Sequence, residues 1–341
     1  MNKFIALWQH RINKYSHLLG MYLFFIKDYL TFAFLKITLP KNQQIVALIL
    51  TKQLGDIVAI EPLIRRIREK YPNEYFVFVC SENFKTIHQN HPAIDLIWVE
   101  YCENGRQKLM LSGVFDVIIN LQFKENSHCK TCNVFVENSQ AEAVNISIFN
   151  YFETYNLLEY NTVIAGFKAA KDYDQQPQLH ISAFQKKIVD DLKLPQKYIA
   201  IHTQSFMDDK DWTPQNWNAL IEWIFIASPY HIVEVGLANT IKTQNPKYRN
   251  LCKQTSIIET AEVIQRADYF IGLDSGPSHL ANAVGTYGFI LIGQLKNYHN
   301  HRPFSGNYDN GSNATIIRNS EGACSELSFD KVLDEIKTKL G

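Results

Sequence analysis

Apolar and polar segments alternate along most of the chain and predict a first series of strands and helices from residue 44 onward. Residues 45–51 form a short β-branched run between polar neighbours, which is typical of a buried strand. Apolar residues then recur at helical spacing from Ile57 to Ile67, and Tyr71 with Pro72 ends that helix. Further strands are predicted at residues 75–80, 96–99 and 115–121, whereas residues 123–160 are less regular.

A second series follows a charged and polar segment, residues 168–177, which has the composition of a linker. Strands are predicted at residues 198–202, 231–235, 268–273 and 287–292, and helices at 214–226, 261–266, 278–284 and 329–340. Two such series predict an α/β protein with two doubly wound, Rossmann-like domains that face a cleft. We place the domains at residues 44–175 and 176–325, between an N-terminal helical extension, residues 1–43, and a C-terminal helix, residues 326–341.

The extension is apolar, aromatic and basic. Its longest charge-free run, residues 15–26, is shorter than the roughly 20 residues that a membrane-spanning helix needs. Residues 1–45 carry six basic residues against one acidic residue, Asp28. This composition fits a helix that lies in a membrane interface. A helix, or a helical pair, packed on the protein or on a second copy explains it as well, so both interpretations stay open.

Composition limits the other possibilities. The 341 residues are 46% hydrophobic and 20% charged, and their formal net charge of zero gives no indication of a nucleic-acid partner. Six scattered cysteines, several in apolar runs, indicate reduced thiols rather than a disulfide framework. Cys129 and Cys132 form a CxxC, but a zinc site usually needs a second ligand pair and the sequence has no second CxxC. Loop thiols are therefore favoured over a metal site, and no metal ligand is assigned.

The first cluster whose side chains could take part in catalysis or binding is TKQLGD, residues 51–56. It lies between the first predicted strand and the helix that follows. Gly55 permits a tight turn, and Asp56 lies near the start of the helix. Asp56 could cap the helix, or it could act as a general base that takes a proton from a hydroxyl. The glycine-rich patterns of dinucleotide or P-loop sites are absent from this turn.

The second cluster, residues 202–214, follows the first strand of the second series. Hydroxyl and amide groups at residues 203–205, together with the compact positive charge of Lys210, could hold phosphates. Alternatively this is a solvated loop in which Lys210 pairs with Asp208 or Asp209.

The third cluster, DSGPSH at residues 274–279, joins a predicted strand to a predicted helix. Backbone N–H groups at a helix start form an anion site, and Gly276 lets a ligand approach the backbone closely. His279 could add a hydrogen bond. The alternative is a helix capped by Asp274 or Ser275.

Together the three clusters resemble glycosyltransferase family 9, the ADP-heptose:lipopolysaccharide heptosyltransferases. The matching stretches are TKQLGDIVAIEPLIRRIREKYP (51–72), IHTQSFMDDKDWTPQNWNALIEWI (201–224) and TAEVIQRADYFIGLDSGPSHLANAVGT (260–286). Their order and spacing also match, so the likeness covers residues 44–340. The DDKDWTP stretch is most similar to the enzymes that add the first heptose to the Kdo of the inner core.

The resemblance implies a GT-B fold, with an N-terminal acceptor domain and a C-terminal donor domain, and an inverting, metal-independent transfer. It implies that Asp56 is the catalytic base, in an acceptor-side turn with Lys52 and Gly55. It assigns the donor diphosphate to Lys210, to Gln204 or Ser205, and to a turn formed by Asp274, Ser275, Gly276, Pro277 and His279.

The partners implied by the resemblance are an ADP-heptose donor and a lipid-linked saccharide acceptor at the inner membrane of a Gram-negative bacterium. The basic, aromatic composition of residues 1–43 fits contact with the cytoplasmic face of that membrane. No cofactor and no nucleic acid are expected, and the oligomeric state stays open.

Three departures from the family pattern concern donor recognition, one of which is the loop from Gly293 to Pro303 in place of a Gly-Pro-Thr loop. The turn after His202 is one residue longer than in the first-heptose enzymes, and a glutamate expected after the 231–235 strand is not evident in GLANTIKTQ. Another family 9 acceptor (protein, capsule or outer-core glycan), another nucleotide-sugar donor, or a non-catalytic binding protein therefore stay open as alternatives.

Overall fold

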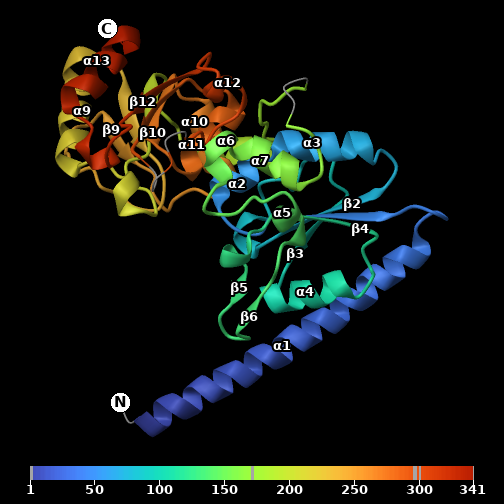
Figure 1. Cartoon of the computed structure of the whole chain (residues 1–341). Coiled ribbons are helices and arrows are strands. Elements are labelled where there is room, and N and C mark those ends of the chain that lie inside the picture. The colour runs from blue at the N-terminus through green and yellow to red at the C-terminus, as the bar shows by residue number, and fades with distance from the viewer. Residues whose placement is uncertain (1–2, 170–172, 295–297, 299–300, 341) are drawn as a thin grey trace. The chain divides into compact units, whose positions relative to one another are not determined.

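The computed structural model describes residues 3–169, 173–294, 298 and 301–340, and its contacts divide the chain into two compact units (Figure 1). Unit 1 comprises Met1–Lys52, Leu63–Asn150 and Asn161–Lys168, and unit 2 comprises Gln53–Pro62, Tyr151–Tyr160 and Ala169–Gly341. The segment that carries Asp56 therefore makes its contacts within unit 2. The domain boundaries expected from the sequence stay predictions, and part of the expected linker, residues 170–172, lies outside the described residues.

Unit 1 is built on a four-stranded parallel sheet in the order β3-β2-β1-β4. The strands are β1 (Ile45–Ile49), β2 (Tyr75–Cys80), β3 (Leu96–Val99) and β4 (Val117–Asn120). All five residues of β1 are buried, as the apolar run predicts. The strand ends two residues earlier than expected, and beyond its end the Thr51 N–H donates to the side chain of Gln122 instead of to a neighbouring strand.

The helices of unit 1 include α1 (Lys3–Thr38), the C-terminal part of α3 (Glu61–Lys70), α4 (Glu103–Leu111) and α5 (Ser139–Ala143). A small antiparallel pair, β5 (His128–Cys129) and β6 (Val134–Phe135), adds to them. The N-terminal extension is thus one long helix, which Figure 1 shows passing alongside α4. Near its C-terminal end, Phe32 is buried against Trp98 and Phe115.

Helix α1 changes one expectation. Within Ile5–Thr38, an 18-residue window has a mean hydropathy of 1.5 and is only 17% buried in the protein, so length and composition alone would allow this helix to cross a membrane. The exclusion of a spanning helix counted only the charge-free run, which stops at Lys27. The helix continues through Lys27 and Asp28 without a break, so its length does not exclude a membrane-spanning helix, and that part of the expectation is wrong.

Unit 2 contains a six-stranded parallel sheet in the order β12-β11-β10-β7-β8-β9. Its strands are β7 (Tyr198–Ile201), β8 (His231–Glu234), β9 (Tyr248–Asn250), β10 (Tyr269–Leu273), β11 (Gly288–Ile292) and β12 (Ala314–Arg318). The two strands that the pattern did not predict, β9 and β12, form the sheet edges. Their residues are mostly half-buried, so they lack a continuous apolar run.

The helices of unit 2 are α2 (Leu54–Ala59), α6 (Tyr151–Thr154), the start of α7 (Leu157–Ile164), α8 (Ala183–Asp191), α9 (Pro214–Ala227), α10 (Ile257–Gln265), α11 (Gly276–Val284), α12 (Gly306–Asp309) and α13 (Phe329–Leu340). The single helix expected from Ile57 to Ile67 is divided into α2 and α3 at Ile60. Pro62 explains the division, because a residue without an N–H is tolerated in a first helical turn but not in a helix interior.

Candidate active site

The three polar clusters converge within unit 2. Asp56 lies on α2, Lys210 ends the 3-10 helix Asp208–Lys210 after β7, and Asp274 directly follows β10. The charges of Lys210 and Asp274 both act on the carboxylate of Asp56. Because β7 and β10 are neighbours in a parallel sheet, their carboxyl ends bring the second and third clusters to the same edge.

Asp56 is not a helix cap. The cap position of α2 is Gln53, whose φ of 71° lies in the left-handed region, and Asp56 is the third helical residue. Its carboxylate is enclosed by protein atoms although the residue keeps some exposed surface. Burial raises the pKa of Asp56 to about 7, the positive charge of Lys210 lowers it in part, and the negative charge of Asp274 raises it. A carboxyl with this pKa can accept a proton near neutral pH.

Helices α2 and α11 approach each other through two glycines. A Cβ on Gly55 would lie 2.6 Å from Cδ2 of His279, and a Cβ on Gly276 would lie 2.5 Å from Cδ2 of Leu54. Both distances are too short for non-bonded carbon atoms. The absence of side chains at these two positions therefore lets the turn that carries Asp56 reach the third cluster.

Lys210 pairs with the third cluster and not with the acidic residues beside it. Its Nζ lies 2.6 Å from Oδ2 of Asp274, and Nε2 of His301 lies 2.8 Å from the same oxygen. Burial would raise the pKa of Asp274, but the charge and hydrogen bonds of Lys210 and His301 hold it well below its ordinary value. The alternative in which Lys210 pairs with Asp208 or Asp209 is thus wrong.

The cap interpretation of the third cluster is confirmed for the position of Ser275 but not for its hydrogen bond. Ser275 occupies the cap position of α11, but its hydroxyl lies 3.0 Å from Nδ1 of His202 and makes no cap hydrogen bond. Gly276 and Pro277 begin the helix, so its N-terminus retains its positive dipole end. Burial lowers the pKa of both His202 and His279 to about 4, which leaves both rings neutral at pH 7.

Other predicted site residues lie elsewhere or are engaged locally. Gln204 is exposed. Ser205 bonds to residues of its own loop: its hydroxyl donates to the Met207 carbonyl and its N–H donates to Asp211. Lys52 belongs to unit 1, where it pairs with Glu103 of α4.

Sequence reasoning missed four residues near these groups. His301 forms a hydrogen bond with Asp274. Tyr151 lies close enough to Asp56 for the charge of Asp56 to raise its pKa. Arg318, half-buried at the end of β12, interacts electrostatically with Asp274. The fourth is Glu234, the last residue of β8, which is fully buried and accepts from the Thr203 hydroxyl at 2.6 Å. Only Glu234 had a signal, a charge at the end of an apolar strand, whereas the others are brought in by packing.

Comparison with known proteins finds one family match. Residues 154–294 match the family model of glycosyltransferase family 9 (heptosyltransferase). No curated protein sequence matches the chain.

Several solved structures share the fold. A glycosyltransferase family 9 protein from Veillonella parvula is 14% identical, with a TM-score of 0.67 over 87% of this chain and 97% of that one. The E. coli ADP-heptose lipopolysaccharide heptosyltransferase II is 16% identical, with a TM-score of 0.62 over 87% and 98%. The E. coli heptosyltransferase WaaC with ADP is 17% identical, with a TM-score of 0.61 over 86% and 99%.

These structures confirm the predicted α/β fold of the GT-B type. The family match assigns residues 154–294 to a glycosyltransferase family 9 domain, which supports a glycosyltransferase.

Proposed function

We propose that the protein transfers a heptose, with inversion and without a metal ion, from ADP-L-glycero-D-manno-heptose to the inner core of a lipopolysaccharide or lipooligosaccharide. The acceptor sugar is Kdo or a heptose. The family match and the ADP bound by WaaC support a nucleotide-diphosphate sugar as donor. The observation that carries the proposal is the enclosed Asp56 carboxylate, with a pKa raised to about 7, beside the Lys210–Asp274 pair.

In this mechanism Asp56 accepts the proton of the acceptor hydroxyl as the hydroxyl oxygen attacks the anomeric carbon. The bond between that carbon and the ADP oxygen breaks on the opposite face, so the configuration inverts and no covalent enzyme intermediate forms. A single base suffices for this displacement, and the carboxyl of Asp56, with a pKa raised to about 7, can serve as that base.

Negative charge builds on the departing ADP, and Lys210 and the N-terminus of α11 supply fixed positive charge for it. Asp274 orients the ammonium group of Lys210 rather than contacting the diphosphate, since it already accepts from Lys210 and His301. The neutral ring of His279 can donate one hydrogen bond to a phosphate oxygen.

The deciding experiment measures nucleotide release with ADP-heptose, UDP-sugars and GDP-sugars in turn, with Kdo–lipid A as acceptor and no added divalent cation. We expect ADP release with ADP-heptose alone, and a product one heptose heavier by mass spectrometry. Turnover with another donor, or with a protein, capsule or outer-core acceptor only, would replace the proposed substrates. ADP binding without turnover on any acceptor would make this a binding protein.

We also propose that α1 places the enzyme on the cytoplasmic face of the inner membrane. One side of the helix exposes an apolar stripe at intervals of three and four residues: Ile12, Tyr15, Leu19, Leu23, Ile26, Leu30, Phe34 and Ile37. The basic residues of the segment would face anionic headgroups. Flotation of the full chain with vesicles containing anionic lipid tests this. Leu23→Glu with Leu30→Glu should abolish flotation, and unchanged flotation would contradict the proposal.

A further inference from the structure

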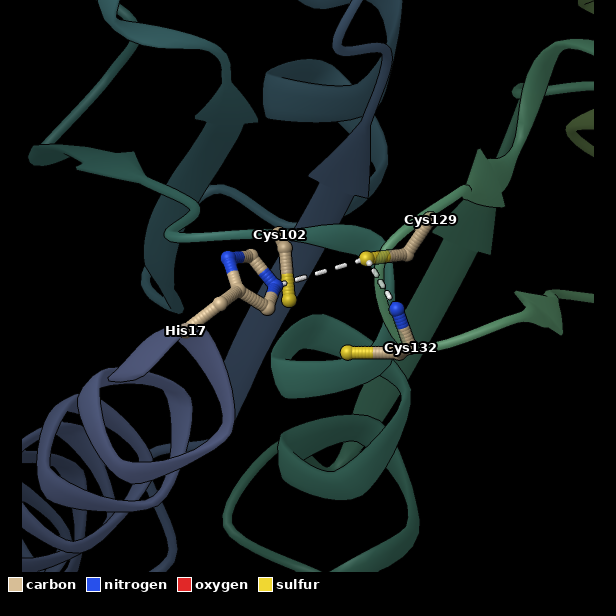
Figure 2. Close-up of side chains that lie close together, drawn as sticks. All are labelled: His17, Cys102, Cys129 and Cys132. Carbon is tan, nitrogen blue, oxygen red and sulfur yellow. Dashed lines mark hydrogen bonds between the residues drawn. The ribbon is translucent and has the colours of Figure 1, made fainter. Parts of the chain in front are cut away.

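Three cysteines and one histidine from separate segments of unit 1 point toward one another (Figure 2). His17 is on α1, Cys102 is the cap residue of α4, Cys129 ends β5, and Cys132 lies in the turn before β6. Their ligand atoms, one ring nitrogen and three sulfurs, all lie within 4.8 Å of one another. Three thiolates and one imidazole form one of the standard ligand sets of structural zinc.

We propose that these four side chains bind a zinc ion. In a tetrahedral site with zinc–sulfur and zinc–nitrogen bonds of about 2.3 and 2.0–2.1 Å, a sulfur and a nitrogen lie about 3.6 Å apart. Nε2 of His17 and Sγ of Cys129 are separated by 3.5 Å. The remaining ligand atoms, all within 4.8 Å, need shifts of about 1 Å or less to reach the sulfur–sulfur separation of about 3.8 Å in such a site.

The surroundings favour a structural site. Cys102 and Cys129 are 8% and 5% exposed, and they pack with Met21 and Leu18 of α1. Four protein ligands fill a tetrahedral shell and leave no position for a substrate or a reactive water. The N–H of Cys132 points at Sγ of Cys129 from 3.4 Å, which is the kind of outer hydrogen bond that stabilises a ligating thiolate.

The arrangement explains more than isolated thiols or a disulfide would. Cys80, Cys252 and Cys324 are also buried, but none belongs to a group of metal-ligand side chains among the described residues. A Cys129–Cys132 disulfide would account for neither Cys102 nor His17. Cys102 and His17, both distant in sequence, supply the second ligand pair that a single CxxC lacks.

The ion would fasten α1 to unit 1 at the point where the helix leaves the body of that unit. Residues 5–16 are all exposed, whereas contacts begin just beyond them. Phe24 stacks on Tyr101 with ring centroids 4.7 Å apart, and a Cβ on Gly20 would lie 2.5 Å from the Tyr101 hydroxyl. A bond from His17 to the ion would fix the direction of the exposed part of α1, because it adds a cross-link between segments that are distant in sequence.

Metal analysis of the full chain, purified with a reductant and without a metal-affinity tag, tests the site. We expect about one zinc per chain by inductively coupled plasma mass spectrometry. After removal of the metal with a chelator, Co²⁺ should restore the visible absorption of a tetrahedral thiolate complex. A metal-free protein that gives no such spectrum with Co²⁺, or a Cys129–Cys132 disulfide found by mass spectrometry, would overturn the proposal.

Variants sharpen the assignment. Cys132→Ser should lower the zinc content well below half of the wild-type value and blue-shift the cobalt spectrum, and His17→Cys should keep the metal in an all-sulfur shell. Cys252→Ser is the matched control, since it removes a buried thiol outside the cluster and should leave the zinc content unchanged. Equal zinc content in Cys132→Ser and wild type would contradict the site.

Hydrogen exchange gives a readout that is independent of metal counting. Removing the zinc should speed exchange in residues 14–24 of α1 severalfold, while the amides of β10 and β11 keep their rates. Unchanged exchange in α1, together with metal loss, would show that the ion does not fasten the helix.

Discussion

Two aspartates of unit 2, both at strand-to-helix turns, have opposite surroundings. Asp56 is enclosed, and no hydrogen bond to its carboxylate is found among the described residues, so burial raises its pKa to about 7. Asp274 is equally enclosed, but it accepts from Lys210 and His301, which hold its pKa far below the ordinary value. Asp56 can therefore act as a base that takes up a proton near neutral pH. Asp274 instead stays an anion and holds the ammonium group of Lys210. The partners, and not the burial, decide the difference.

Removal of the base is the largest expected effect. Asp56→Asn keeps the size of the side chain but cannot accept the hydroxyl proton, so kcat should fall by about 10²–10⁴-fold. Isothermal titration should show ADP affinity within about threefold of wild type, because Asp56 does not contact the diphosphate in our mechanism. The surface variant Asp330→Asn controls for the substitution itself. A kcat within threefold of wild type would remove Asp56 from the role of base.

Loss of the lysine tests the other turn. Lys210→Met should weaken ADP binding by about 10–100-fold, which corresponds to a lost charged hydrogen bond. It also leaves Asp274 buried with only His301, so the variant should unfold at lower denaturant. Adding Asp274→Asn should recover part of that stability without recovering ADP affinity. The exposed Lys187→Met is the control, and normal ADP affinity in Lys210→Met would contradict a diphosphate role.

The pH dependence should separate the two carboxyls. A base with a pKa of about 7 must be ionised to act, so kcat/KM should rise about tenfold per pH unit below 7 and level off above it. Asp274 stays ionised throughout this range and should contribute no step. The measurement is a kcat/KM profile from pH 5 to 9. A flat profile between pH 5.5 and 8 would contradict the raised pKa of Asp56.

The smallest effect concerns stability. The pKa of Asp56 is higher in the folded chain, about 7, than its ordinary value of 3.8, so the folded state binds this proton more tightly. The folded state is therefore favoured at low pH and loses that stability as the pH rises through 7. Asp56→Asn has no such proton to lose, so its free energy of unfolding at pH 8 should exceed that of wild type by on the order of 2 kcal/mol. This difference should vanish near pH 4. Urea unfolding at both pH values provides the test.

The sequence pattern predicted the elements whose apolar residues are consecutive or recur at helical spacing. Strands β2 and β3 and helix α13 have the predicted bounds, because their apolar residues follow the period of the element. Edge strand β12 escaped prediction, since its residues alternate in burial only weakly. The clusters around Asp56, Lys210 and Asp274 were also found from the sequence, because polar residues at the carboxyl ends of parallel strands are unusual enough to stand out.

The order of elements, the two α/β series and the candidate donor turn were thus determined by local pattern alone. The tertiary structure decided what no local pattern contains: that Lys210 pairs with Asp274 rather than with Asp208 or Asp209, and that His301 joins them. It also brought His17 and Cys102 to the single CxxC, which looked incomplete on its own. Periodicity reports which side of an element is buried, whereas partners across the fold depend on how separate elements pack, and that information is spread over the whole chain.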